Sequence, residues 1–85
     1  MEELDEVFAA LSHGLRRRII ALLAGSRGLS YGDLLRSTGV ESSMLSFHLR
    51  KLRGLVERGG DGLYRLTGLG LKAARVLACV QGGVG

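Results

Sequence analysis

Apolar residues repeat at helical spacing through the first half of the chain. In residues 4–11 they fall at i, i+3, i+4 and i+7, the spacing of one buried helix face, which predicts a first helix. A second helix is predicted over residues 13–24, with Ser12 as its N-cap and Gly25 as its end. A third, short helix is predicted to begin at Ser30, whose hydroxyl can cap it. The first half of the chain is therefore expected to be helical.

A tight turn is predicted between the third helix and a fourth. The turn spans residues 37–40, where Gly39 is the residue best able to take a positive φ. The fourth helix is predicted over residues 41–53, and its leucines, among them Leu45 and Leu52, share one face that must be buried. Two helices joined by a short glycine-containing turn form a helix-turn-helix.

The pattern changes after Gly54. Two short runs on either side of a Gly-Gly-Asp-Gly segment predict a β-hairpin over about residues 55–66. Thr67 is expected to cap a last helix over residues 67–80, and the glycine-rich tail at 82–85 is expected to fray.

These elements predict a single domain over residues 1–81, mostly α-helical with a small β-hairpin. With 85 residues the chain has room for one domain. A hairpin that follows a helix-turn-helix is called a wing, so the expected fold is a winged helix-turn-helix. A third strand around Leu29 is a candidate partner for the hairpin.

Charge is distributed unevenly along the chain, although the net charge is only +4. The first fifteen residues carry four acidic side chains and no basic one. Residues 16–75 hold all 12 Lys and Arg with the other four acidic residues, which gives this segment a charge of +8. A compact basic region attracts phosphate polyanions. A solvated basic surface would have the same composition, so charge alone does not decide.

The sequence offers little chemistry for catalysis or metal binding. No paired carboxylates, nucleophile with a base, or phosphate-binding loop is found, so neither an enzyme nor a cofactor is expected. The two histidines and the single cysteine, Cys79, are too far apart in sequence for zinc spacing. A lone thiol, no signal peptide and no apolar run of about 18–20 residues predict a soluble cytoplasmic protein without a membrane partner.

Three parts of the chain resemble the ArsR-like winged-helix regulators. Residues 11–20 (LSHGLRRRII) resemble the start of their second helix, and residues 39–52 (GVESSMLSFHLRKL) resemble their recognition helix. Leu-Val at 55–56 with Tyr-Arg-Leu-Thr at 64–67 resembles their wing. The resemblance covers about residues 4–78. It implies a homodimeric transcription regulator, associated with the nucleoid, that binds specific sites in double-stranded DNA.

The chain departs from the family pattern at two places. Gly14 stands where family members usually have proline, so the second helix has a less rigid start. Thiol-based metal sensors of the family carry a Cys-x-Cys pair in the helix before the turn, whereas residues 31–35 here contain no thiol. Metal sensing is therefore not implied, and no small-molecule effector is evident.

Candidate DNA-binding residues lie on the fourth predicted helix and on the wing. The helix face opposite the leucines presents short serine hydroxyls, an aromatic ring and arginine to a major groove, and the wing arginines would lie along phosphates or in the minor groove. The family resemblance adds the histidine. The expected contact residues are Ser42, Ser43, Ser46, Phe47, His48, Arg50, Arg53, Arg58 and Arg65.

Several of these residues also have a structural interpretation. The ring of Phe47 would belong to the core if it folded onto the third helix, and His48 at the margin of an apolar face would be a structural residue. Weaker phosphate candidates are Arg36, Lys51 and, among the residues named above, Arg53. For the run at 16–18, pairing with the acids Glu2, Glu3 and Glu6 is favoured over DNA contact.

The last predicted helix is apolar nearly all round, which requires burial on two sides. One side would pack on its own domain, and the other, together with the first helix, would form a homodimer interface. The expected interface residues are Leu4, Phe8, Leu69, Ala73, Val76 and Val80. The alternative is that a longer first helix covers this surface within one monomer.

Two other functions remain open from the sequence. One is an architectural, chromatin-type protein that coats DNA with low sequence specificity. The other is a winged helix used only for protein contacts.

Overall fold

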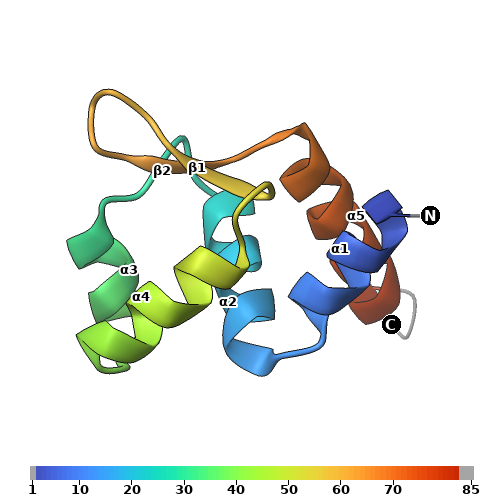
Figure 1. Cartoon of the computed structure of the whole chain (residues 1–85), viewed down its shortest axis with the longest axis horizontal. Coiled ribbons are helices and arrows are strands. Elements are labelled where there is room, and N and C mark those ends of the chain that lie inside the picture. The colour runs from blue at the N-terminus through green and yellow to red at the C-terminus, as the bar shows by residue number, and fades with distance from the viewer. Residues whose placement is uncertain (1, 83–85) are drawn as a thin grey trace.

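The structure, a computed structural model, describes the backbone of residues 2–82 and the side chains of residues 5–80 (Figure 1). Its elements follow the predicted order of helix, helix, helix-turn-helix, hairpin and helix. They are α1 (Glu2–Leu11), α2 (Gly14–Ala24), α3 (Tyr31–Thr38), α4 (Ser42–Lys51), β1 (Val56–Arg58), β2 (Tyr64–Leu66) and α5 (Gly68–Gly82). The predicted winged helix-turn-helix is confirmed.

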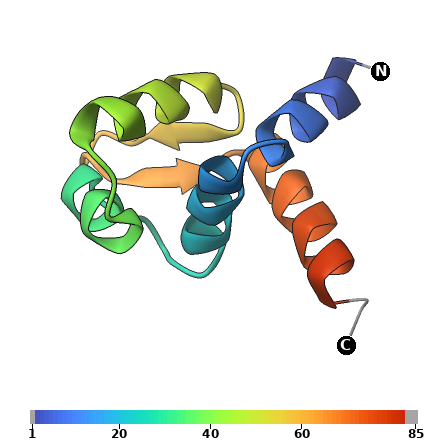
Figure 2. The same ribbon diagram turned by 90° about the horizontal axis from the view of Figure 1, so that it is seen from below.

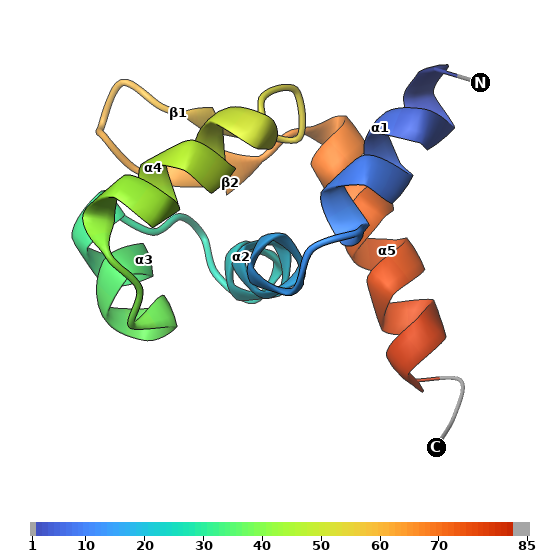
Figure 3. The same ribbon diagram turned by 60° about the horizontal axis from the view of Figure 1, so that its bottom comes forward.

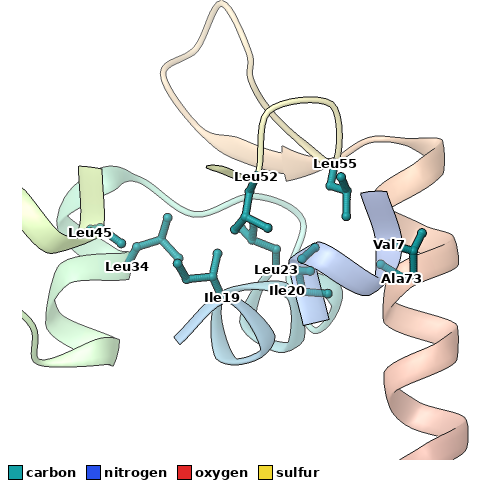
Figure 4. Close-up of a cluster of buried hydrophobic side chains, with 10 residues drawn as sticks. Val7, Ile19, Ile20, Leu23, Leu34, Leu45, Leu52, Leu55 and Ala73 are labelled. Carbon is teal, nitrogen blue, oxygen red and sulfur yellow. The ribbon is translucent and has the colours of Figure 1, made fainter. Parts of the chain in front are cut away.

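The hydrophobic core is centred on α2, which lies between the helix-turn-helix on one side and α1 with α5 on the other (Figure 3). Ile19 and Ile20 of α2 are completely buried, in one cluster with Leu34 of α3 and Leu45 of α4 (Figure 4). Burying one such side chain stabilises a fold by roughly 1.5–3 kcal/mol. The core cluster consists of Val7, Ala10, Ile19, Ile20, Leu23, Leu34, Leu45, Leu52, Leu55 and Ala73.

The start of α2 differs from the prediction. Its N-cap is His13, whose Nδ1 accepts a hydrogen bond from the backbone N–H of Leu15 at 3.1 Å. Ser12 instead donates its hydroxyl to the carbonyl oxygen of Ala9 at 2.7 Å, so it closes the end of α1. The expected Ser12 cap is therefore wrong, because that hydroxyl is used by the preceding helix.

The two helices of the helix-turn-helix begin and end close to the predicted residues. Ser30 caps α3 in a capping box with Asp33, and the turn contains Gly39 in the left-handed region at φ 69°. Helix α4 is shorter than the predicted 41–53 because its N-cap is Glu41 and its C-cap is Leu52.

The hairpin pairs antiparallel, with Val56 opposite Leu66 and Arg58 opposite Tyr64. Leu29 forms one additional bridge to Tyr64, through backbone hydrogen bonds of 3.1 and 2.7 Å. The expected third strand is thus a single bridge that ties the hairpin to the end of the α2–α3 connection.

Helix α5 packs against both α1 and α2 of its own chain (Figures 1 and 3). Thr67 accepts the N–H of Gly70 at 3.1 Å, which confirms the predicted cap. At Gly70 the helix backbone comes so close to the hairpin that an added Cβ would collide with the carbonyl oxygen of Leu55. Ala73 is 0% exposed, so the expectation that it lies in a dimer interface is wrong. The α1 helix of the same chain takes part in covering that side of α5.

Candidate nucleic-acid interface

One face of α4 is buried in the core and the opposite face is exposed. Leu45 and the C-cap Leu52 are completely buried, whereas Ser43, Phe47 and Arg50 are exposed. Figure 2 shows α4 on the outside of the domain, following α3 and running beside the hairpin. The helix therefore presents a continuous row of side chains that the rest of the described chain does not cover.

A hollow of about 420 Å³ opens between α4 and the hairpin. Three arginines border it, Arg50 of α4, Arg53 of the connection from α4 to β1, and Arg58 of β1, and we call it the arginine hollow. Two tyrosine rings, from α3 and β2, complete its rim. Its lining residues are Tyr31, Ser46, Leu49, Arg50, Arg53, Val56, Arg58 and Tyr64.

The positive charge of the arginine hollow is not neutralised within residues 5–80. The ion pairs found there join Arg36 to Asp33 at 2.6 Å and Arg65 to Asp61 at 2.7 Å, and neither involves an arginine of the hollow. Arg58 stacks its guanidinium 5.9 Å from the centroid of the Tyr64 ring, which orients it without neutralising it. Guanidinium groups bind the oxygens of phosphate in bidentate fashion, so the hollow suits a phosphate-bearing ligand.

Arg65 has a different place from the one predicted. Its Nη1 and Nη2 bond to the two carboxylate oxygens of Asp61 at 3.2 and 2.7 Å, and its Nε donates to the carbonyl oxygen of Arg27 at 2.9 Å. The Arg65 side chain, together with the N–H of Leu63, lowers the pKa of Asp61 to about 2. Each nitrogen of this guanidinium donates one hydrogen bond within the protein, so Arg65 braces the hairpin. Two of its five N–H groups have no partner among these bonds and its side chain is 43% exposed, so contact with DNA stays a prediction.

The α4 serines differ in how they are held. Ser43 is exposed, whereas the hydroxyls of Ser42 and Ser46 lie 2.8 and 2.7 Å from the Tyr31 hydroxyl. Tyr31 also donates to the carbonyl oxygen of Ser42 at 2.8 Å. Sequence reasoning missed Tyr31, because a tyrosine at the first turn of a helix carries no local signal of a contact eleven and fifteen residues away.

Phe47 lies in the open, with 44% of its surface exposed. Its ring stands edge-on to that of His48 at 5.1 Å, and the Lys51 ammonium lies 5.4 Å from its centroid. The alternative in which Phe47 joins the core against α3 is therefore wrong. An exposed aromatic ring on such a helix can contact the methyl group of thymine.

His48 turns inward and is only 5% exposed. Its Nδ1 accepts from Nε of Arg16 at 3.3 Å, and its ring lies 4.2 Å from that of His13. The expectation that His48 contacts DNA is corrected, because the residue joins α4 to α2 inside the domain.

The arginines of α2 donate to backbone oxygens at the ends of other elements. Arg16 bonds to the carbonyl of Ala9 at 2.9 Å, and Arg17 bonds to that of Leu11 at 2.6 Å. Arg18 reaches across to Ser37 O at 2.7 Å. These arginines fasten α1 and α3 to α2. The predicted pairing with Glu6 is not found among the described side chains, and the side chains of Glu2 and Glu3 lie outside the described residues.

Lowering the pH from 7.5 to 5.5 is expected to destabilise the protein through His48. Burial lowers the pKa of His48 below its usual value near 6.5, and the nearby charges of His13 and Arg16 lower it further. As the pH falls, His48 is protonated in the unfolded chain before it is protonated in the folded protein. The free energy of unfolding therefore has its full value above about pH 6.5 and decreases as the pH drops towards the lowered pKa.

Urea unfolding at pH 7.5, 6.5 and 5.5 measures this effect. In His48→Asn an amide oxygen can accept from Arg16 but does not titrate, so the loss of stability over this range should shrink. An unchanged pH dependence in that variant would assign the effect to another group.

The outer surface of α1 and α5 carries the residues expected at a dimer interface. Phe8 of α1 and Val80 of α5 are 60% and 64% exposed, and Leu71, elsewhere on α5, is 50% exposed. Leu69 and Val76 are half-buried against the core. The side chain of Leu4 lies outside the described residues. Exposed apolar residues therefore remain on α1 and α5, fewer than the sequence indicated.

Residues 2–82 contain no helix long and apolar enough to cross a bilayer. The described side chains also include no cluster of three or more His, Cys, Asp or Glu placed to hold a metal ion.

Comparison with known proteins gives relatives of both sequence and structure. Residues 4–77 match the family described as a domain of unknown function, DUF7347. The HTH-type transcriptional regulator YgaV of Escherichia coli (strain K12) is 39% identical over 62 residues, which is 71% of this chain and 63% of that protein. The chain thus spans less than two thirds of that relative. The crystal structure of the transcriptional repressor BigR from Xylella fastidiosa superposes with a TM-score of 0.79 and 30% identity, over 95% of this chain and 85% of that one.

Proposed function

Because the chain belongs to the DUF7347 family and shares its fold with a transcriptional repressor, we propose that it is a transcription regulator that binds specific sites in double-stranded DNA. The observation that carries the proposal is the open face of α4 beside the arginine hollow. The open face of α4 supplies groups that can distinguish bases. The arginine hollow supplies unneutralised positive charge for the DNA phosphates next to those bases.

In this proposal α4 enters the major groove with its N-terminal end leading. Ser43, Phe47 and Arg50 then face the base edges, where arginine can bind guanine and an aromatic ring can contact a thymine methyl. Arg53 and Arg58 contact the sugar–phosphate backbone where it passes between α4 and the hairpin. The backbone contacts fix the position of the helix, and the base contacts select the site.

We further propose that the active form is a homodimer. Phe8 of α1 and Leu71 and Val80 of α5 are exposed apolar residues, and α1 and α5 lie on the side of the domain away from the hairpin and α4 (Figure 3). A second copy related by a two-fold axis would cover these residues and present two α4 helices to successive major grooves. Affiliation with the ArsR-like regulators and action on the nucleoid are further predictions of the same proposal.

The other two functions have less support. The three arginines of the hollow could also bind carboxylates of a protein partner, but the relatives found are a transcriptional regulator and a transcriptional repressor, which favours DNA. An architectural protein would use the charge but not the serine, phenylalanine and arginine side chains on α4, and the curated relative is a transcriptional regulator.

Selection of bound duplexes from a random pool tests the proposed function. We expect a roughly palindromic consensus with half-sites about 10–10.5 base pairs apart, as a two-fold dimer requires. At fixed physiological salt, affinity for the selected duplex should exceed affinity for a random duplex by at least about 10³-fold. A ratio near one would instead support an architectural protein, and no binding at low salt would support a protein-interaction module.

A further inference from the structure

We infer that Tyr31 is a positioning residue that fixes the hydroxyls of Ser42 and Ser46 as hydrogen-bond acceptors, so that α4 selects the amino groups of adenine or cytosine. The inference rests on the proposed function and deepens it, because it names the base edges that this end of the helix recognises.

The three hydroxyl groups form one network at the N-terminal end of α4. Tyr31 opens α3, and its hydroxyl oxygen lies 2.8 Å from Oγ of Ser42 and 2.7 Å from Oγ of Ser46. It also lies 2.8 Å from the carbonyl oxygen of Ser42. Tyr31 and Ser46 both line the arginine hollow, so this network borders the space that DNA would occupy.

Counting hydrogens fixes the direction of each bond. A phenol has one hydrogen to donate, and a backbone carbonyl can only accept. The Tyr31 hydrogen is therefore used on the carbonyl of Ser42, and the phenol oxygen must accept from both serine hydroxyls. The lowered pKa of the Tyr31 phenol agrees with this direction, because the bonds from Ser42 and Ser46 stabilise its charged form.

Both serine hydrogens thus point towards Tyr31, and only oxygen lone pairs remain for a ligand. A free serine bonds to donors and acceptors alike and therefore discriminates poorly between bases. A serine restricted to accepting requires a donor, and the donors in the major groove are the amino groups N6–H₂ of adenine and N4–H₂ of cytosine. Guanine O6 and N7 and thymine O4 are acceptors, so their lone pairs would face the lone pairs of the serine oxygens and no hydrogen bond would form.

The test compares Tyr31→Phe with Tyr64→Phe. Both substitutions keep the ring and remove one hydroxyl from the rim of the same hollow, but the Tyr64 hydroxyl lies outside the serine network. Competition binding would use the wild-type consensus duplex and duplexes with each of the other base pairs at every position. Thermal unfolding would confirm that both variants are folded.

We expect the wild type to prefer adenine or cytosine at one or two positions in each half-site. Tyr31→Phe should reduce that preference about 5–10-fold, the value of one hydrogen bond, while affinity for random duplexes changes less than about twofold. Ser46→Ala should reduce the preference at one of the same positions. Tyr64→Phe should leave the base preferences unchanged.

The possible outcomes distinguish failure of this inference from failure of the proposed function on which it rests. If the wild type selects sites but Tyr31→Phe keeps its base preferences, or weakens all duplexes equally, the inference is overturned and the proposed function stands. If the wild type shows no base preference at any position, the proposed function fails and the inference fails with it.

Discussion

Replacing Gly70 by alanine is expected to lower the free energy of unfolding by about 2–4 kcal/mol, against the usual trend for glycines in helices. In an open helix this change stabilises a protein by roughly 1 kcal/mol, because alanine restricts the unfolded chain. Here the new Cβ would collide with the carbonyl oxygen of Leu55 and press on the side chain of Leu66. The backbone of α5 and the hairpin would have to separate. Thermal and urea unfolding measure the loss.

Gly68→Ala is the matched control, because it changes the same residue type two positions earlier in the same helix. A Cβ at Gly68 would meet nothing within 4 Å, so this variant should be as stable as the wild type or slightly more stable. Equal stability of Gly70→Ala and Gly68→Ala would show that α5 does not pack against the Leu55 carbonyl in solution.

The double variant Arg53→Ala, Arg58→Ala is expected to lose DNA affinity at physiological salt, on the order of 30-fold per subunit and about 10³-fold for a dimer. Each phosphate contact releases about 0.9 counterion, so losing two contacts in each of two subunits should reduce the slope of log affinity against log salt by about 3.6. Titrations of one duplex at several salt concentrations give both quantities. The loss should be similar for selected and random duplexes, because phosphates carry no base identity.

The control for charge is the double variant Lys72→Ala, Arg75→Ala. It lowers the net charge equally but lies on α5, away from the arginine hollow, and it should keep nearly the wild-type salt slope once its dimer is verified by gel filtration. If the slope of log affinity against log salt fell equally in both double variants, DNA affinity would depend on net charge alone and DNA would not occupy the hollow.

Periodicity and capping chemistry were sufficient to predict most of the fold. The leucines of α4, the Ser30 cap and the positive φ at Gly39 are local features, and local features can be read from neighbouring residues. Ala73 was misassigned because spacing shows that a helix is apolar on two sides, but not which element covers each side. That depends on how α1 packs against α5, a contact between the two ends of the chain.

The open face of α4 was predictable for the same reason, since Phe47 and Arg50 lie opposite its leucines. The roles of His48 and Arg65 were not. Each of these side chains is satisfied by a partner that the sequence does not single out, Arg16 on α2 and Asp61 in the hairpin loop. A basic or aromatic residue in a motif indicates potential contact, and only the fold shows whether another residue of the protein already uses it.

The way the hairpin is braced limits what kind of DNA this protein can distinguish. Residues 59–63, at the tip of the hairpin, include no basic side chain; of the two arginines that flank them, Arg65 is bound to Asp61 and Arg58 stacks on the Tyr64 ring without an ion pair. Arginines that probe the narrow minor groove of A-tracts need a free cation at such a tip. In the proposed complex, recognition of sequence-dependent DNA shape in the flanks of an operator would therefore depend mainly on Arg58.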